Sequence, residues 1–348
     1  MTDTQLIIGM PAGSLANTNR GGNLIQLLEK AGFRTSGYDS GGPSSFTTIN
    51  YLFGWDGRPQ EFGSQLGIGE LDVAIAGDDW IKERILELKL EYNTEIQLEK
   101  VLSLKRGGVR LVGIINNPEF KTTEDYLKEL TKSKKIITVV TEMPYLAVNW
   151  IQTTLKKIGV SDRYTQFSVQ KYKTPSRIEQ GILIYETWGK TEAKIKNGGA
   201  DIGLEITQSG SAIRNYGLTI TETVLESETG IYINPGLKKD DRKTDLLRMF
   251  LLNLYGVVNA ENKVMILFNV ANEKSGDIEN YLGDNELFAD EPTKNVGKSF
   301  TEFSIQVNVD NKKQSLAQVR YELAKRGAAN IDTLPIDSSI QNIEVLNL

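Results

Sequence analysis

The sequence predicts an α/β fold that is followed by a smaller unit of ferredoxin-like topology. Two kinds of segment alternate along the chain. Short apolar runs such as residues 6–10 and 73–76 are typical of buried strands, and segments such as 24–31 carry apolar residues at helical spacing. In the last part of the sequence the elements follow the order βαββαβ, which is the order of a ferredoxin-like unit. Such alternation favours sheets covered by helices.

The first elements begin with a strand that leads through a loop into a helix. We expect a strand at residues 6–11, a helix at 24–31 and a long loop or hairpin at 36–50. A second helix should begin at residue 59, and a second strand should span residues 71–76. Pro59 suits the first position of its helix, where a missing N–H needs no partner. The charged helical segment 81–100 is expected to be a solvated surface insertion.

The middle of the chain continues the pattern up to residue 260. We expect strands at 106–115, 136–140, 182–185, 202–206 and 230–234, and helices at 121–135, 144–158, from 192, and 246–260. The ferredoxin-like unit then comprises strands at 264–270, near 292–293, at 298–309 and at 330–336, with helices at 276–282 and 316–324.

Composition narrows the possible chemistry. The 348 residues include no cysteine and no histidine, which excludes disulfides, thiolate and histidine metal ligands, and Ser–His catalysis. A metal would therefore be a hard cation held by carboxylates and phosphates, with Mg²⁺ first. The net charge of −5 argues against nucleic acid as a partner. We expect no signal peptide and no membrane span, and hence a cytoplasmic protein.

Residues 199–218 predict an anion site. The strand around Ile202, Leu204 and Ile206 runs into a turn of small polar residues, after which a short helix begins near Ser211, with Ser209 or Ser211 as its cap. Backbone N–H groups, hydroxyls and the helix start would converge there on a phosphate. The alternative is a plain strand-to-helix connection without a ligand. Glu205, just before the turn, is placed to hold sugar hydroxyls or a phosphate-bound metal.

This turn resembles the ribose-phosphate loop of the ATP phosphoribosyltransferase family, which catalyses the first step of histidine biosynthesis. The family pattern is an Asp-Leu-Val strand end followed by Thr-Gly-x-Thr. Here Glu205 stands for the Asp, Ser209 for the first Thr, Gly210 matches, and Ala212 replaces the second Thr.

Further family motifs occur in the same order along residues 6–340. In the opening loop Gly13 and Leu15 match, while Ala12 and Ser14 stand where the family has basic residues; Arg20 could supply that charge, or be simply solvated. The remaining matches are Arg58-Pro59, Gly69-x-x-Asp72, Gly77-x-Asp79, Thr141-x-x-Pro144, Gly189-x-x-Glu192, Asn269-Val270, Pro292-Thr293 and Gly327-Ala328.

The resemblance implies two α/β lobes like those of periplasmic binding proteins. Lobe I would comprise residues 1–112 and 218–260, lobe II residues 113–217, and a regulatory ferredoxin-like domain residues 261–348. It also implies transfer of a phosphoribosyl group from phosphoribosyl pyrophosphate to N1 of ATP, with Mg²⁺, inhibition by histidine, and assembly as a homo-oligomer (dimer or hexamer).

By the same resemblance, site residues fall into three groups. Glu205 and Glu192 are the catalytic candidates, and Glu205 is also the candidate metal ligand. Phosphoribosyl pyrophosphate would contact Glu205, Thr207, Gln208, Ser209, Gly210, Ser211 and Ala212. ATP would contact Gly13, Ser14, Leu15, Arg20, Arg58 and Asp79, although a structural ion pair is the alternative role for Arg58.

Two other functions fit the same residues. Two lobes joined by crossing strands also suit a non-catalytic binder of a small molecule or nucleotide. A regulatory paralogue without activity is favoured by Ala12, Ser14 and Ala212, which lack the polar or basic groups of the family.

Overall fold

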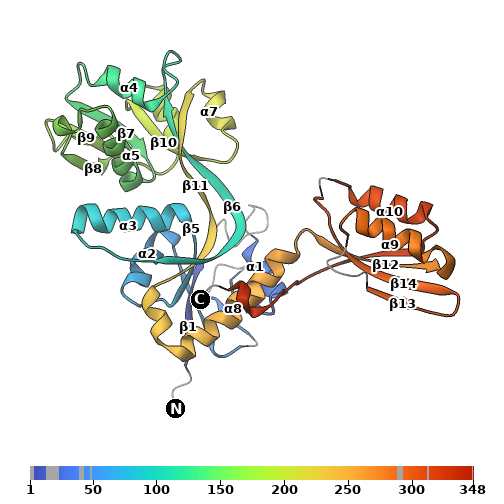
Figure 1. Ribbon diagram of the computed structural model, residues 1–348. Coiled ribbons are helices and arrows are strands. Elements are labelled where there is room, and N and C mark those ends of the chain that lie inside the picture. The colour runs from blue at the N-terminus through green and yellow to red at the C-terminus, as the bar shows by residue number, and fades with distance from the viewer. Residues whose placement is uncertain are drawn as a thin grey trace. The chain divides into compact units, whose positions relative to one another are not determined.

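The computed structural model describes residues 4–12, 23–38, 43–47, 49–287, 293–311, 313–346 and 348 (Figure 1). The chain forms two compact units. Gln26–Phe33 and Leu247–Asn347 make up the second unit, and the rest of the chain makes up the first. The predicted class, two α/β lobes followed by a ferredoxin-like unit, is confirmed by the topology of the sheets.

Within the described residues of the first unit, nine strands form one continuous sheet in the order β4-β1-β5-β11-β6-β10-β7-β9-β8. Their bounds are β1 Leu6–Pro11, β4 Leu52–Gly57, β5 Val73–Gly77, β6 Glu99–Ile115, β7 Ile136–Thr141, β8 Phe167–Lys171, β9 Gly181–Glu186, β10 Ile202–Thr207 and β11 Thr219–Ile233. A hairpin of β2 (Thr35–Ser36) and β3 (Ser45–Phe46) lies in the predicted loop or hairpin region.

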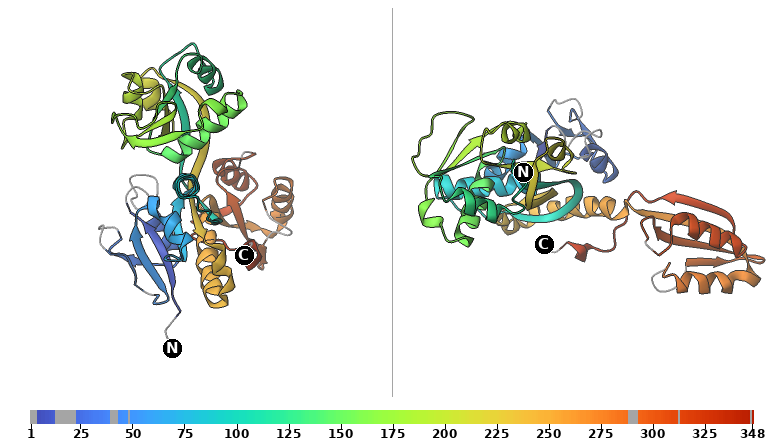
Figure 2. Two further views of the ribbon diagram at one scale, coloured as in Figure 1. Left: turned by 90° about the vertical axis from the view of Figure 1, so that its left-hand side faces the viewer. Right: turned by 90° about the horizontal axis from the view of Figure 1, so that it is seen from above.

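Two long strands connect the lobes. In lobe I, β1 pairs in parallel with β4 and β5; in lobe II, β7 pairs in parallel with β9 and β10. β6 and β11 run antiparallel to each other and pass from one lobe into the other, as Figures 1 and 2 show. The exact residues at which the lobes divide, 112 and 218, stay a prediction.

Helices flank the sheet of the first unit. They are α2 Pro59–Gly67, α3 Asp78–Tyr92, α4 Thr123–Leu130, α5 Pro144–Lys157, α6 Thr191–Lys196 and α7 Ser211–Asn215. One core of lobe II lies between the strands and α4 and α5, and a second core on the opposite face is closed by α6 and α7. Helices on both faces explain why the parallel strands read as continuous apolar runs.

The predicted surface insertion at residues 81–100 is wrong. Helix α3 ends at Tyr92, with Asn93 in the left-handed region, and β6 already begins at Glu99. Ile81 belongs to the core of lobe I, whereas Leu86 and Leu90 pack on the core of lobe II. Because its apolar residues serve two different cores, α3 lacks the single apolar face by which a buried helix is recognised from sequence.

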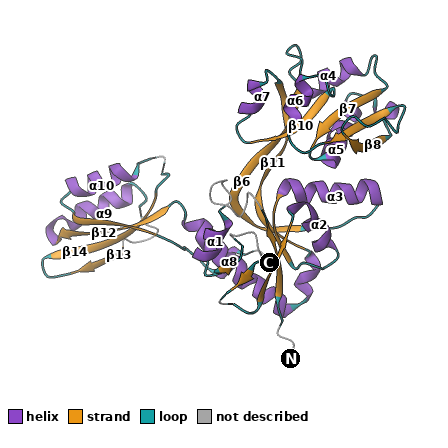
Figure 3. Cartoon of the chain, turned by 180° about the vertical axis from the view of Figure 1, so that it is seen from behind, coloured by secondary structure: helices purple, strands orange, loops and turns teal. Residues whose placement is uncertain are grey.

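The second unit contains the ferredoxin-like topology. Its elements are β12 Lys263–Ala271, α9 Ser275–Asp284, β13 Thr293–Val296, β14 Phe300–Asn308, α10 Leu316–Lys325 and β15 Ala329–Pro335, with the sheet order β13-β14-β12-β15. Figure 3 shows α9 and α10 on one face of this antiparallel sheet. The rings of Phe268 and Phe303 stack in the core of this unit, with their centroids 5.3 Å apart. The strand predicted near residues 292–293 is β13.

The remaining helices are α1 (Leu24–Lys30) and α8 (Asp241–Ala260). The rings of Phe33, just after α1, and Phe250 in α8 lie 5.0 Å apart within the second unit. The four short 3₁₀ turns are Ser161–Arg163, Pro235–Lys239, Asn272–Lys274 and Ile343–Val345 among the described residues. No helix in the part of the chain that the structure describes is long and apolar enough to cross a membrane.

Candidate functional site

The parallel strands of both lobes end at sheet edges of the kind where α/β proteins bind ligands. In lobe I, β1, β4 and β5 end at Pro11, Gly57 and Gly77. In lobe II, β7 and β10 end at Thr141 and Thr207. The predicted site residues that the structure describes all lie close to these ends, whereas Gly13, Ser14, Leu15 and Arg20 lie outside the described residues.

The turn between β10 and α7 is closed by its own side chains. The Gly210 N–H donates to the Thr207 hydroxyl at 2.8 Å, and the hydroxyls of Ser209 and Ser211 lie 2.7 Å apart. Gly210 adopts a φ of 73°, which favours glycine, and it is the residue before α7. The N-cap residue Gly210 has no side chain to cap α7, a helix of only five residues, but the Ser209 hydroxyl, one of the two predicted caps, accepts the N–H of Ser211 at the helix start at 3.3 Å.

The exposed side of this turn carries the residues expected to meet a phosphate. Gln208, Ser209, Ser211 and Ala212 are exposed, and Gly210 is buried beneath them. The hydroxyls of Ser209 and Ser211 belong to exposed residues and can meet an anion there, whereas the N–H groups of Gly210 and Ser211 already donate to the hydroxyls of Thr207 and Ser209. At Ala212 the turn presents a methyl group.

Arg214 is a residue of the turn that sequence reasoning missed. Its guanidinium folds back and donates to the Ser209 carbonyl oxygen at 2.9 Å and to the Ser211 hydroxyl at 3.3 Å. A fixed positive charge therefore lies beside the predicted phosphate position. The only signal in the sequence was its spacing of three residues from Ser211, which one helical turn brings together.

Glu205 lies on β10, and only one of its two carboxylate oxygens accepts a hydrogen bond among the described residues. Oε1 accepts the Ile206 N–H at 3.1 Å, but Oε2 is buried and has no hydrogen-bond partner among the described residues. Burial, followed by repulsion from Glu192 and then Glu142, raises the pKa of Glu205 to about 7; the nearby Thr191 side chain and the Ile206 N–H oppose this rise.

Glu142 and Glu192 both lie near enough to Glu205 to act on its charge, and these three residues are called here the lobe II carboxylates. Glu142 follows β7, Glu192 lies in the first turn of α6, and Glu205 is on β10. The structure brings the two predicted catalytic residues together and adds Glu142, which sequence reasoning missed. Its place after a parallel strand was the available signal.

A metal would have to be held here by few protein ligands. In the described ranges no group of three or more acidic side chains is arranged to hold a metal ion. The open Oε2 of Glu205 still offers one carboxylate oxygen. Mg²⁺ commonly binds through one or two carboxylates together with substrate phosphates, so this chain fits a metal that arrives with its ligand.

Lobe I contributes a cavity of about 420 Å³ at the ends of its parallel strands. It brings together Arg58, Asp79 and Trp80 from lobe I and Ile206, the neighbour of Glu205. Arg58 precedes α2, is exposed, and has no side-chain hydrogen bond or ion pair in the described part of the chain, so the predicted alternative of a structural ion pair finds no partner there.

Asp79 is buried at the start of α3. Its carboxylate accepts the Trp80 N–H at 2.9 Å, and its own N–H donates to the Ser227 hydroxyl on β11 at 3.1 Å. Burial raises its pKa above the ordinary range. A Cβ on Gly77 would lie 2.3 Å from an Asp79 oxygen, so glycine is needed at that strand end. The predicted ATP residues Arg58 and Asp79 therefore line one cavity.

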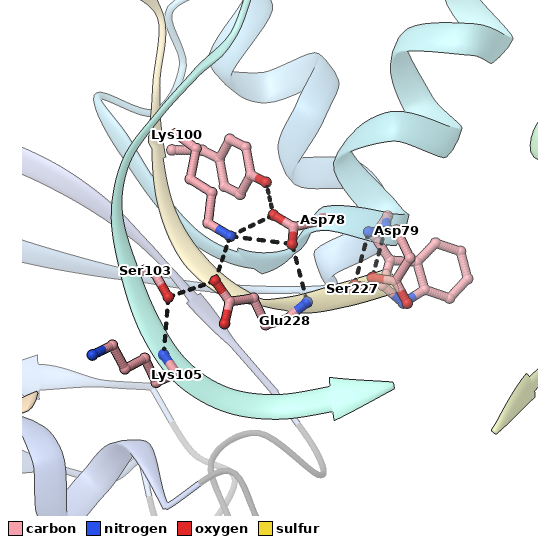
Figure 4. Close-up of polar contacts among 9 residues, drawn as sticks. Asp78, Asp79, Lys100, Ser103, Lys105, Ser227 and Glu228 are labelled. Atoms are coloured by element: carbon pink, nitrogen blue, oxygen red, sulfur yellow. Dashed lines mark hydrogen bonds and ion pairs between the residues drawn. The ribbon is translucent and has the colours of Figure 1, made fainter. Parts of the chain in front are cut away.

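A second group of charges, shown in Figure 4, joins the two crossing strands to the start of α3. We call Asp78, Lys100, Ser103, Glu228 and Tyr232 the crossing-strand cluster. The Lys100 ammonium is 2.8 Å from Asp78 Oδ1 and 3.0 Å from Glu228 Oε1. The Glu228 N–H donates to Asp78 Oδ2 at 3.0 Å, and the Tyr232 and Ser103 hydroxyls donate to Asp78 and Glu228.

Beside this cluster is a cavity of about 500 Å³ lined by Asp78, Arg110, Gln208 and Glu228, among others. It brings Gln208 of the predicted phosphate turn close to Arg110 of β6. The predicted phosphoribosyl contacts therefore divide: Gln208 lines this cavity, whereas Glu205 does not line it and lies near Thr191 and Glu192 of α6.

Comparison with known proteins decides the family. A family model described as ATP phosphoribosyltransferase (HisG) matches residues 58–254, which is more than half of the chain. The chain belongs to the ATP phosphoribosyltransferase family. It is therefore a phosphoribosyltransferase, an enzyme of glycosyl transfer in histidine biosynthesis, and the family expected from its motifs is confirmed.

Several ATP phosphoribosyltransferases are similar over most of the chain. The protein of Desulfatibacillum aliphaticivorans is 28% identical over 287 residues, which cover 80% of each chain. ATP phosphoribosyltransferase 1 of Geobacter sulfurreducens is 25% identical over 343 residues, 96% of this chain and 99% of that one. A solved structure of the ATP phosphoribosyl transferase (HisG:HisZ) complex from Thermotoga maritima aligns at a TM-score of 0.49 and 15% identity, over 72% of this chain and 98% of that chain.

Proposed function

We propose that this enzyme transfers the phosphoribosyl group of phosphoribosyl pyrophosphate to N1 of ATP and releases pyrophosphate. The observation that carries the proposal is Glu205: its buried, unpartnered oxygen lies directly before a turn that carries the exposed hydroxyl residues Ser209 and Ser211. A carboxylate next to an anion-binding turn is the combination that a ribose phosphate needs, because the sugar offers hydroxyl donors beside its phosphate.

The donor lies at the edge of lobe II. The 5-phosphate binds the turn of Thr207, Ser209, Gly210 and Ser211, and Arg214 adds charge from the side. The Glu205 carboxylate accepts hydrogen bonds from the ribose hydroxyls, with Glu192 next to it. As the C1–O bond to pyrophosphate breaks, positive charge builds on the ribose, and nearby carboxylates stabilise it.

ATP lies in the cavity of lobe I, near Arg58 and Asp79. Binding both substrates on one sheet fixes the line of approach of adenine N1 to the ribose carbon, which lowers the entropic part of the barrier. Gly13, Ser14, Leu15 and Arg20 stay predicted contacts on this side. Mg²⁺ bound by Glu205 and the donor would neutralise charge on the departing pyrophosphate.

The decisive experiment mixes the protein with ATP, phosphoribosyl pyrophosphate and Mg²⁺ and follows product absorbance. We expect phosphoribosyl-ATP and pyrophosphate in equal amounts. The alternative, a regulatory paralogue that binds nucleotide without turnover, is motivated by the exposed methyl group of Ala212 in place of a hydroxyl. Tight ATP binding without product would favour that alternative.

The second unit supports a regulatory role, and we propose that histidine inhibits the enzyme through it and that the enzyme is a homo-oligomer. Its sheet order is ferredoxin-like, and the resemblance in sequence implies the small-molecule-sensing domain of the family's longer members. Histidine at millimolar concentration should lower turnover and raise the melting temperature. If neither changes, the domain has lost this sensing role. Light scattering measures the oligomeric state.

A further inference from the structure

Gln60 has an unmet hydrogen-bonding capacity in the cavity of lobe I. It occupies the first turn of α2, after Pro59, and lines the cavity of about 420 Å³. Its Oε1 atom is buried, and neither end of its side-chain amide is hydrogen-bonded within the described ranges. Buried amide oxygens are normally paired, so the unpaired oxygen of a residue that lines a cavity is a candidate acceptor for a donor on a ligand.

The surroundings of Gln60 suit a flat heteroaromatic ring. Trp80 lines the same cavity and is half-buried, and Ile206 adds apolar surface from lobe II. An aromatic wall together with a single amide is the usual composition of a site that binds a base by stacking and reads its edge by hydrogen bonds.

We infer that Gln60 reads the Hoogsteen edge of adenine, accepting from the N6 amino group through Oε1 and donating to N7 through Nε2. This inference rests on the proposed function, in which N1 is the nucleophile. The lone pair of N1 has to stay free, which leaves N6 and N7 as the edge available for recognition. Glutamine forms this two-bond pair with adenine when it reads DNA.

The pairing also defines a specificity. A 6-oxopurine carries acceptors at both O6 and N7, so one of them always faces the amide oxygen, whichever way the amide is turned. An adenine nucleotide satisfies both ends of the amide. Gln60 therefore selects 6-aminopurine over 6-oxopurine nucleotides.

The chain offers a matched control on the same helix. Gln65 also has a buried Oε1 without a hydrogen-bond partner among the described residues, but it does not line the cavity. Gln60→Leu and Gln65→Leu both remove an unpaired buried amide, so both variants should fold. A difference between them in nucleotide binding then reports on the cavity alone.

The test measures binding of ATP and of 7-deaza-ATP, which lacks the N7 acceptor, by calorimetry without the sugar donor. We expect the wild-type enzyme to prefer ATP by about tenfold, the effect of one good hydrogen bond. Gln60→Leu should bind ATP about tenfold more weakly and show no preference, whereas Gln65→Leu should behave as the wild type. A Gln60→Leu variant that keeps the preference would overturn the inference.

Gln60→Glu is a second, independent variant. A carboxylate still accepts from N6 but faces the N7 lone pair, so this variant should prefer 7-deaza-ATP over ATP. Retained preference for ATP would again overturn the inference. Turnover is measured in parallel: absence of product in the wild type contradicts the proposed transfer, whereas the binding preferences decide the role of Gln60 separately.

Discussion

The crossing-strand cluster and the lobe II carboxylates gather acidic side chains in opposite ways. In the first, Asp78 accepts from Lys100, Tyr232 and the Glu228 N–H. Burial alone would raise the pKa of Asp78, but these hydrogen bonds outweigh it and lower the pKa. In the second, burial and neighbouring acids raise the pKa of Glu205 to about 7, and Oε2 has no partner among the described residues.

The difference separates charges that stabilise the fold from charges that remain available to a ligand. The crossing-strand cluster ties β6, β11 and the start of α3 together, so its hydrogen bonds stabilise lobe I where the two crossing strands leave it. Among the lobe II carboxylates, Glu205 is repelled by Glu192 and Glu142, and a cation or the hydroxyl donors of a ligand would stabilise its charged form. Perturbed, incompletely paired groups are typical of functional sites, where local stability is lower.

The largest effect should come from removing the cation of the crossing-strand cluster. Lys100→Met keeps the aliphatic stem but leaves Asp78 and Glu228 facing each other, and we expect the free energy of unfolding to fall by about 3 kcal/mol. The matched control is Lys89→Met. Lys89 is 57% exposed and pairs with Glu95, against 27% for Lys100, so its loss should be below about 1 kcal/mol in urea titrations. Equal losses would contradict the comparison.

Glu205→Gln should have the opposite effect to Lys100→Met: it should weaken use of the substrate but not lower the stability of the fold. The amide cannot provide a charged acceptor, so use of the ribose-phosphate donor should weaken by about 2 kcal/mol, or roughly thirtyfold in kcat/KM. Stability at pH 7 should stay the same or rise, because a repelled carboxylate is removed. Steady-state kinetics measure the expected loss in kcat/KM, and thermal unfolding measures the expected effect on stability. Unchanged kinetics would mean that the carboxylate does not contact the sugar.

Sequence patterns correctly predicted the features that depend on residues close together in the chain. The strand and turn around Glu205 and the helix that begins at Pro59 follow from spacing and small residues within a few positions. The β-α-β-β-α-β order of the second unit was recovered in the same way.

What sequence reasoning missed depends on contacts between distant segments. The crossing-strand cluster joins residues 78, 100 and 228, and no local pattern marks such a meeting. α3 looked solvated because its apolar residues pack into two separate cores. Gln60 stands out only through a hydrogen bond that it lacks, which requires knowledge of all its neighbours.

Glu83 sharpens the comparison, because it combines good partners with a raised pKa. On α3 of lobe I, its carboxylate accepts the N–H groups of Tyr145 and Leu146, at 2.9 and 2.7 Å, at the start of α5 in lobe II. Burial nevertheless raises its pKa to about 7; the two N–H groups oppose this rise, and Glu87 and Glu186 add to it.

A carboxyl whose pKa is higher in the folded than in the unfolded state stabilises the fold at low pH, and this contribution is lost as the pH rises through the folded value. For Glu83, with an ordinary pKa of 4.5, we expect stability to fall by about 1.5 kcal/mol between pH 5.5 and pH 7. Urea titrations at several pH values measure how the free energy of unfolding changes with pH. Glu83→Gln should remove the part of this pH dependence that Glu83 causes, and Glu205→Gln should remove the separate part that Glu205 causes. An unchanged slope in Glu83→Gln would mean that its partners at the start of α5 keep it ionised, as Lys100 keeps Asp78 ionised, and would place Glu83 with the structural charges.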